Sequence, residues 1–324
     1  MISDTPPPPP PAIAMATDTP VTAAGQFVWR EVATDSGTRR YRLYIPGGHD
    51  GSRALPLVVM LHGCTQDADN IARGTRMNVA ADAKKIVIAY PEQPASANAL
   101  RCWNWFDPAN QQRDKGEPAL IAAITRQIMN DVKIDRARIY IAGVSAGAAM
   151  ALTLMYSYPD VYSAVGIHSG IAYGFVGSMV EGVKAMGVGA SDSQMLGAAA
   201  VRAMGERARP VAAIVFHGGA DVVVKAVNGA QVVSQLQAAN FAAATLKKGA
   251  VSAAVPVASS GETTGGYHYG RVVHGGAGAM VEEWTVKELG HAWSGGSPEG
   301  TYTDAKGPDA TAEMIRFFLE HPRR

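Results

Sequence analysis

The chain has 324 residues, enough for one large domain or two small ones; 47% are hydrophobic and 18% are charged. Its 29 Lys and Arg residues nearly balance its 28 Asp and Glu residues, giving a formal net charge of +1. This composition favours a sizeable buried core and excludes the strongly basic surface that nucleic acid or an anionic membrane would need. We therefore expect a neutral or weakly charged substrate and no nucleic-acid partner.

The chain opens with a proline-rich segment. Pro6 to Pro11 is an unbroken proline run, which predicts a stiff, extended, solvent-exposed tail over residues 1–25. A docking motif for a proline-binding partner is the alternative. No ordinary signal peptide is visible, and no stretch approaches the roughly 20 apolar residues that a membrane span needs.

From residue 26 onward, short apolar strands alternate with helical patterns, which is typical of a mostly parallel sheet covered by helices on both faces. We expect strands at 27–32, 40–45, 57–61, 86–90, 138–142, 163–167, 211–216 and, as the last one, 281–286. We expect helices at 69–84, 117–132, 146–156, 231–244 and 311–320. The first two strands flank Asp35-Ser36-Gly37, a turn signal, and are predicted to form an antiparallel hairpin. The sequence thus predicts one α/β domain over residues 26–324.

Two segments lack a clear pattern. Residues 171–209 are rich in Gly, Ala and Met, and they lie between two predicted core strands. Long insertions of this kind often serve as lids or binding loops, and a pair of plain packed helices fits equally well. The Gly-rich residues 261–278 predict a hairpin or a surface loop.

The candidate nucleophile is Ser145. Gly143-Val144-Ser145-Ala146-Gly147 matches the G-x-S-x-G elbow, although chance gives roughly 0.2 such matches in a chain of this composition. The context is more specific, because the motif follows a predicted apolar strand and opens a predicted helix. There the glycines allow a sharp turn that exposes the serine hydroxyl at the carboxyl edge of the sheet. A structural turn serine is the alternative.

A serine hydroxyl needs a base to remove its proton and an acid to orient that base. His291 follows the last predicted strand, where the base of such a fold belongs, and Asp221 follows a core strand between Ser145 and His291. These three residues therefore occur in the order Ser, acid, His that the elbow architecture uses. The other histidines are assigned to loops, packing or the periphery: His49, His62, His168, His217, His268, His274 and His321.

Developing negative charge on the substrate needs backbone donors. We assign them to the amides of Ala146, directly after the nucleophile, and of Cys64, in the loop after the strand at 57–61. Cys64 and Cys102 are the only cysteines, and their spacing suits no zinc site. The residues alone leave open whether the two cysteines pair or stay reduced. No metal or organic cofactor is expected.

Four motifs occur in order along the chain: Leu61-His62-Gly63-Cys64-Thr65-Gln66, Cys102-Trp103-Asn104-Trp105-Phe106, the elbow, and Gly290-His291-Ala292-Trp293-Ser294-Gly295-Gly296. Together they resemble the poly(3-hydroxybutyrate) depolymerase family of esterases, and feruloyl and acetyl xylan esterases look like relatives by the same motifs. The resemblance extends from about Gln26 to the C-terminus.

The resemblance implies an α/β-hydrolase fold and a triad of Ser145, Asp221 and His291. It also implies a Cys64–Cys102 disulfide and an extracellular or periplasmic location, even though no signal peptide is visible. Three tryptophans lie near the predicted catalytic loops, where they would line a substrate groove or pack in the core: Trp103, Trp105 and Trp293.

We therefore expect a serine esterase that hydrolyses a poly(3-hydroxybutyrate)-type polyester, or its oligomers, through an acyl-enzyme. A feruloyl or acetyl xylan esterase, an amide-cleaving enzyme of the same fold and a non-catalytic binding protein are the alternatives.

Overall fold

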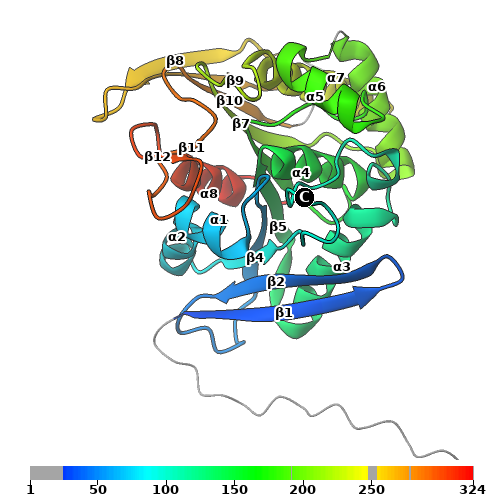
Figure 1. The fold of residues 1–324 in the computed structure, drawn as a ribbon, viewed down its shortest axis with the longest axis vertical. Coiled ribbons are helices and arrows are strands. Elements are labelled where there is room, and N and C mark those ends of the chain that lie inside the picture. Colours follow the sequence, from blue (N-terminus) through cyan, green and yellow to red (C-terminus); the bar gives the residue numbers. More distant parts are fainter. Residues whose placement is uncertain (1–24, 191, 247–253, 277–278, 324) are drawn as a thin grey trace, which may run out of the picture.

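A ten-stranded sheet forms the frame of the molecule (Figure 1). The computed structural model describes residues 25–190, 192–246, 254–276 and 279–323, so the predicted tail lies outside it apart from Gly25. In sheet order the strands are β1 (Gln26–Thr34), β2 (Gly37–Ile45), β4 (Val87–Pro91), β3 (Leu55–Leu61), β5 (Ile134–Val144), β6 (Ala164–His168), β7 (Ala212–Gly218), β10 (Val281–Val286), β9 (His268–His274) and β8 (Val257–Glu262).

The six central strands, from β4 to β10 in that order, run parallel to their neighbours. Antiparallel pairs extend the sheet at both edges, β1 with β2 on one side and β8 with β9 on the other. The helices are α1 (Ala68–Thr75), α2 (Met77–Lys84), η1 (Pro108–Asn110), α3 (Gly116–Asp131), α4 (Ala146–Ser157), α5 (Met179–Val188), α6 (Ser193–Met204), η2 (Gly205–Arg207), α7 (Val227–Leu246) and α8 (Ala310–Glu320). This arrangement confirms the predicted α/β class.

Two hydrophobic cores lie on opposite faces of the sheet. Helices α3, α4, α6 and α7 cover one face, and α1, α2 and α8 cover the other (Figure 1). All seven residues of β3 are buried, because alternate side chains enter the two cores: Leu57, Val59 and Leu61 on one side, Val58 and Met60 on the other. Burial on both faces explains why this strand reads as a continuous apolar run.

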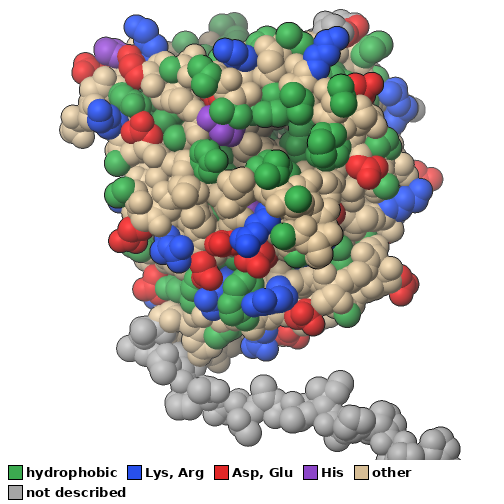
Figure 2. Space-filling view, in the orientation of Figure 1, with side chains coloured by type: hydrophobic (Ala, Val, Ile, Leu, Met, Phe, Trp, Pro, Cys, Tyr) green, Lys and Arg blue, Asp and Glu red, His purple; other side chains and the backbone are tan. Residues whose placement is uncertain are grey.

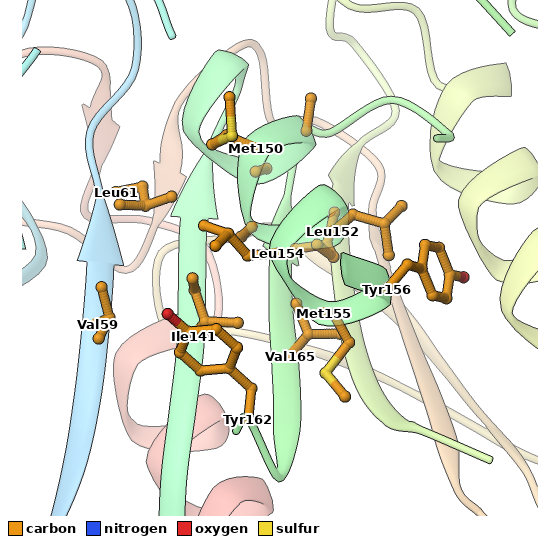
Figure 3. Close-up of a cluster of buried hydrophobic side chains, with 14 of the residues drawn as sticks. Val59, Leu61, Ile141, Met150, Leu152, Leu154, Met155, Tyr156, Tyr162 and Val165 are labelled. Atoms are coloured by element: carbon orange, nitrogen blue, oxygen red, sulfur yellow. The ribbon is translucent and has the colours of Figure 1, made fainter. Parts of the chain in front are cut away.

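Helix α4 lies in the middle of the first core. Every residue of this helix is buried, and its side chains pack over β5 and β6 together with residues from β3 (Figure 3). A helix enclosed in this way cannot shift without disturbing close-packed neighbours. The residue at its N-terminus is therefore held rigidly above the sheet.

The prediction of a single helix over residues 69–84 is wrong in one respect, because this segment forms two helices. α1 ends at Thr75 and α2 begins at Met77, and Arg76 between them has a φ of 53°, in the left-handed region. The preceding Thr75 hydroxyl donates to the carbonyl of Ile71 and accepts from the amide of Met77. This local hydrogen bonding competes with the helix ladder and ends the first helix.

Two further segments differ from the simplest expectation. Val281–Val286 is not the last strand, because a small separate sheet follows it, formed by β11 (Trp293–Ser294) and β12 (Thr303–Asp304). Residues 171–209 contain α5, α6 and η2, so the segment is mainly helical, and β8 and β9 form the hairpin predicted near 261–278, of which 277–278 lie outside the described residues.

The packing of α8 yields a stability prediction. Phe318 is 1% exposed and its ring stacks on Tyr140 of β5, with ring centroids 4.9 Å apart. Phe318→Ala should lower the free energy of unfolding by about 3–5 kcal/mol, because it opens a cavity in a close-packed core. Phe241→Ala, at an exposed position on α7, is the control and should change it by no more than about 0.5 kcal/mol in urea titrations. Equal losses in both variants would contradict this packing.

Candidate active site

Ser145 occupies a sharp turn between the end of β5 and the start of α4. Its φ of 56° and ψ of −122° are unusual for a side-chain-bearing residue. The backbones are crowded here, because a Cβ atom on Gly147 would collide with the carbonyl oxygens of Leu61 and His62, and one on Gly143 with the backbone of Gly147. Both glycines of the elbow motif are therefore required sterically, and they place Ser145 at the carboxyl edge of the sheet.

His291 and Asp221 form a hydrogen-bonded pair. The Nδ1 atom of His291 lies 2.7 Å from Oδ2 of Asp221, whose other oxygen accepts from the amides of Val223 (2.9 Å) and Val224 (2.8 Å). Burial alone would raise the pKa of Asp221, but the hydrogen bonds from His291 and the two amides outweigh it and hold that pKa below its usual value. The carboxylate is thus ionised, and it fixes the orientation of the imidazole.

A cavity of about 340 Å³ brings Ser145 and His291 together at the carboxyl ends of the strands. Among the described residues no hydrogen bond joins these two side chains; such bonds often tighten only when substrate is bound. The remaining lining is largely apolar: Gly63, Cys64, Gln66, Asn98, Leu100, Cys102, Trp105, Phe106, Val144, Met179, Gly182, Val183, Met186, Val223 and Tyr302. The structure therefore brings the predicted nucleophile and base to one apolar cavity, with the predicted acid hydrogen-bonded to the base.

The loop after β3 lies directly against the elbow. A Cβ atom on Gly63 would be 3.5 Å from Cβ of Ser145, and the amide of Gly63 donates to the side chain of Gln66. In the described chain, the amides of Cys64 and Ala146 take no part in the turn and loop hydrogen bonds. Cys64 and Ser145 line the same cavity, and Ala146 directly follows Ser145, so the oxyanion assignment to these two amides stays a prediction.

A disulfide holds this loop in place. The Sγ atoms of Cys64 and Cys102 are 2.00 Å apart, and the amide of Thr65 donates to the carbonyl of Leu100. These bonds tie the loop to the segment that carries Trp105. The loop that would bind the oxyanion is thus anchored to one wall of the cavity.

The three tryptophans that were predicted near the site differ in their environments. Trp105 lines the cavity, but Trp103 and Trp293 do not, which corrects the prediction that they bind substrate. Trp103 is fully buried and donates its indole N–H to the carbonyl of His62, while buried Trp293 donates to Thr311. A buried indole N–H needs an acceptor, and here the backbone after β3 and a side chain of α8 supply one each.

Sequence reasoning missed how three buried histidines support the site. His62 Nε2 accepts from the amide of Gln93, His168 Nε2 accepts from the amide of Ser294, and His217 Nε2 lies 2.8 Å from the carbonyl of Val224. The sequence assigned these histidines only to loops or packing. Their positions could have identified them as site residues, because His62 directly follows β3, and His168 and His217 lie at the carboxyl ends of β6 and β7.

Within the described ranges, no cluster of three or more His, Cys, Asp or Glu side chains is suited to holding a metal ion. No helix there combines the length and hydropathy that crossing a bilayer requires. A second cavity of about 500 Å³ lies at the amino ends of β6 and β7, near Arg209 and Arg323, and contains none of the predicted site residues.

Residues 39–256 match the family described as esterase PHB depolymerase. The chain belongs to that family. The matched region includes Ser145 and Asp221 and ends before His291.

Several relatives of this family show how far the likeness extends. Poly(3-hydroxyalkanoate) depolymerase C of Paucimonas lemoignei is 27% identical over 267 residues, which cover 80% of this chain and 59% of that protein. Feruloyl esterase B of Thermothelomyces thermophilus is 32% identical over 133 residues, 41% of this chain and 44% of that protein. The chain thus spans about half the length of these relatives.

The acetyl xylan esterase from Aspergillus awamori has a similar structure, with a TM-score of 0.70 and 16% identity. The match covers 90% of this chain and 99% of that one. This likeness shows the α/β-hydrolase fold that the sequence predicted.

The buried histidines predict acid sensitivity. Burial lowers the pKa of His62 to about 4 and that of His168 to about 3, so both are neutral when folded but titrate near 6.5 when unfolded. Because the unfolded state binds more protons below pH 6.5, their stabilisation is complete above that pH and is lost as the pH falls toward the folded values. Between pH 5 and 6, each of these histidines should make the free energy of unfolding rise with pH by about 1.4 kcal/mol per pH unit.

Urea unfolding at several pH values measures this slope. His168→Gln removes one of the titrating groups and should lower the slope by about 1.4 kcal/mol per pH unit, whatever its effect on stability at pH 8. His268→Gln, on the exposed hairpin, is the matched control. An identical slope in wild type and His168→Gln would contradict a buried neutral imidazole at position 168.

The disulfide yields a separate prediction. Cys64 and Cys102 are 38 residues apart, so replacing both by serine should lower the free energy of unfolding by about 3–4 kcal/mol. A reducing agent should destabilise the wild type by a similar amount and leave the double variant unchanged. A wild type that unfolds at the same urea concentration with and without reductant would argue against the bond.

Proposed function

We propose that this protein is a serine carboxylic ester hydrolase that uses Ser145 as nucleophile, His291 as general base and Asp221 as the residue that orients the base. The observation that carries the proposal is the 2.7 Å Asp221–His291 hydrogen bond at a cavity that Ser145 also lines. Membership of an esterase family supports it.

In the proposed mechanism, His291 takes the proton of the Ser145 hydroxyl as its oxygen attacks the ester carbonyl. The amides of Cys64 and Ala146 stabilise the resulting oxyanion. His291 then gives its proton to the departing alcohol oxygen, leaving an acyl-enzyme on Ser145. Water loses a proton to the same histidine and attacks the acyl carbonyl; the bond to the Ser145 oxygen then breaks, the acid departs, and His291 returns its proton to that oxygen.

The substrate that we propose is a poly(3-hydroxybutyrate)-type polyester or its oligomers. No Asp, Glu, Lys or Arg of the described chain lines the cavity, which suits an uncharged, largely apolar ester. Apolar side chains also stay exposed around it, among them Leu100 (63%), Met179 (57%) and Val183 (65%). Figure 2 shows hydrophobic side chains gathered on this face, beneath the α5 helix of Figure 1.

A second candidate is the hydrolysis of feruloyl or acetyl esters on polysaccharide. Trp105 and Phe106 place two aromatic rings in the cavity wall, which would suit an aromatic acyl group. Product analysis separates the two, because a polyester yields hydroxy acids, whereas feruloylated or acetylated xylan yields ferulate or acetate. In either case the disulfide favours an oxidising compartment, extracellular or periplasmic.

The test compares wild type with Ser145→Ala on a suspension of amorphous poly(3-hydroxybutyrate) and on p-nitrophenyl butyrate. Loss of the nucleophile should lower turnover of both substrates by about 10⁴-fold or more and abolish labelling by a fluorophosphonate. Ser234→Ala on α7, away from the cavity, is the matched control and should keep full activity.

Each outcome bears on a different part of the proposal. Ester turnover without clearing of the suspension would keep the mechanism and move the substrate to small or polysaccharide-linked esters. Undiminished activity in Ser145→Ala would show that the mechanism is wrong. A wild type that binds esters without hydrolysing them would indicate a non-catalytic protein.

A further inference from the structure

Tyr302 has an unusual backbone conformation beside the site. Its φ is 53°, in the left-handed region that bulky side chains rarely adopt. Such a conformation persists where the surrounding structure enforces it, and residues of this kind cluster at functional sites. Tyr302 is nevertheless 49% exposed, so burial of its own ring is not what holds it there.

Hydrogen bonds on both sides of Tyr302 enforce this conformation. Its carbonyl accepts from the amide of Trp293 at 2.7 Å, immediately after the loop that carries His291. Two side chains hold the neighbouring Thr301. Its carbonyl accepts from the Gln66 side chain at 2.9 Å, and its amide donates to the Asn70 side chain at 3.1 Å. Gln66 is the residue that also holds Gly63 beside Ser145. Tyr302 is therefore fixed relative to both the base and the oxyanion loop.

The side chain of Tyr302 lies between these two parts of the site. It lines the cavity, and its ring stands edge-on to His291 with centroids 6.4 Å apart. Its phenol oxygen accepts a hydrogen bond from Oγ1 of Thr65 at 3.4 Å, and the same threonine hydroxyl also donates to the carbonyl of Cys64 at 2.6 Å. Among the described residues the Tyr302 phenol donates its own proton to no group, so that proton is available to a ligand in the cavity that Tyr302 lines.

We propose that Tyr302 binds the alcohol part of the ester and donates a hydrogen bond to it, which makes it a specificity-determining residue. The inference rests on the proposed function, because His291 must reach the departing alcohol oxygen to protonate it. The alcohol part must then lie next to His291, along the wall that Tyr302 forms.

The chemistry of a polyester gives this donor an acceptor. In poly(3-hydroxybutyrate) the departing alcohol is the 3-hydroxyl of the next unit, which carries its own carbonyl two carbons away. A phenol beside the alcohol oxygen is within reach of that carbonyl oxygen. An alcohol without a carbonyl offers the phenol no such acceptor, so Tyr302 selects hydroxyacyl alcohols over simple ones.

Recognition of the alcohol is measured by letting an added alcohol compete with water for the acyl-enzyme. Wild type and variants receive p-nitrophenyl butyrate, which leaves the same butyryl-enzyme on Ser145 in every case. Methyl 3-hydroxybutyrate or 2-butanol is then added, and the ratio of transfer ester to free butyrate is measured. Both are secondary alcohols, and only the first carries the carbonyl. The ratio reports recognition of the alcohol and is independent of how fast the acyl-enzyme forms.

Tyr302→Phe keeps the ring and removes the donor. It should lower the ratio for methyl 3-hydroxybutyrate about 5- to 10-fold, as expected for one lost hydrogen bond, and change the ratio for 2-butanol less than about twofold. The matched control is Tyr267→Phe, which loses a hydrogen bond to Asp304 of β12 but does not line the cavity. Both of its ratios should equal those of wild type.

Two results for Tyr302→Phe would overturn the assignment of Tyr302: the same fall in the transfer ratio for both alcohols, or no change in either ratio. If butyrate is still released normally, the proposed function stands in both cases. A change in the same direction in Tyr267→Phe would show that the loop matters rather than the phenol, and would also overturn the assignment of Tyr302. If the wild type released no butyrate at all, the proposed function would fail, and the assignment of Tyr302 with it.

Discussion

The close approach of two backbone segments is the constraint on which the candidate site depends. Helix α4 begins so near the end of β3 that residue 147 has no room for a Cβ atom beside the carbonyls of Leu61 and His62. This proximity places Ser145, Gly63 and the amides of Cys64 and Ala146 within one small region. Because α4 is buried along its whole length, the region cannot relax by moving the helix. A hydrophobic core thus fixes the geometry of a polar site.

Buried neutral imidazoles extend this rigidity to the loops. His168 shows how one residue connects two parts of the site: its carbonyl accepts from the amide of Ser145, and its ring accepts from the amide of Ser294, near His291. The ring also packs against Phe216 and Trp293. Burial keeps the pKa of His168 far below neutrality, so this acceptor is not lost to protonation near neutral pH.

The sequence predicted those parts of the molecule that follow from local pattern. Strand and helix alternation revealed the parallel sheet, and the order of Ser145, Asp221 and His291 indicated a triad, because each residue follows its own core strand. The break at Arg76 was not predictable, because it arises from a side-chain hydrogen bond in a segment with an otherwise good helical pattern.

The tryptophans and Tyr302 show a different limit of sequence reasoning. Trp103 and Trp105 are two residues apart, yet one is in the core and the other lines the cavity, because the chain there is irregular and alternation does not apply. Tyr302 gave no signal, since its role depends on hydrogen bonds to Gln66 and Asn70 through a neighbour. Contacts between segments far apart in sequence decide such cases.

The apolar lining and the buried acid act together in the proposed mechanism. When His291 takes the proton of Ser145, an imidazolium forms against a carboxylate that is 2% exposed and already satisfied by two amides. An ester that fills the apolar cavity expels water, and the attraction between Asp221 and the new positive charge then strengthens in the lower dielectric. A polar, hydrated cavity would screen this attraction. The same side chains that favour an apolar ester therefore also favour its cleavage.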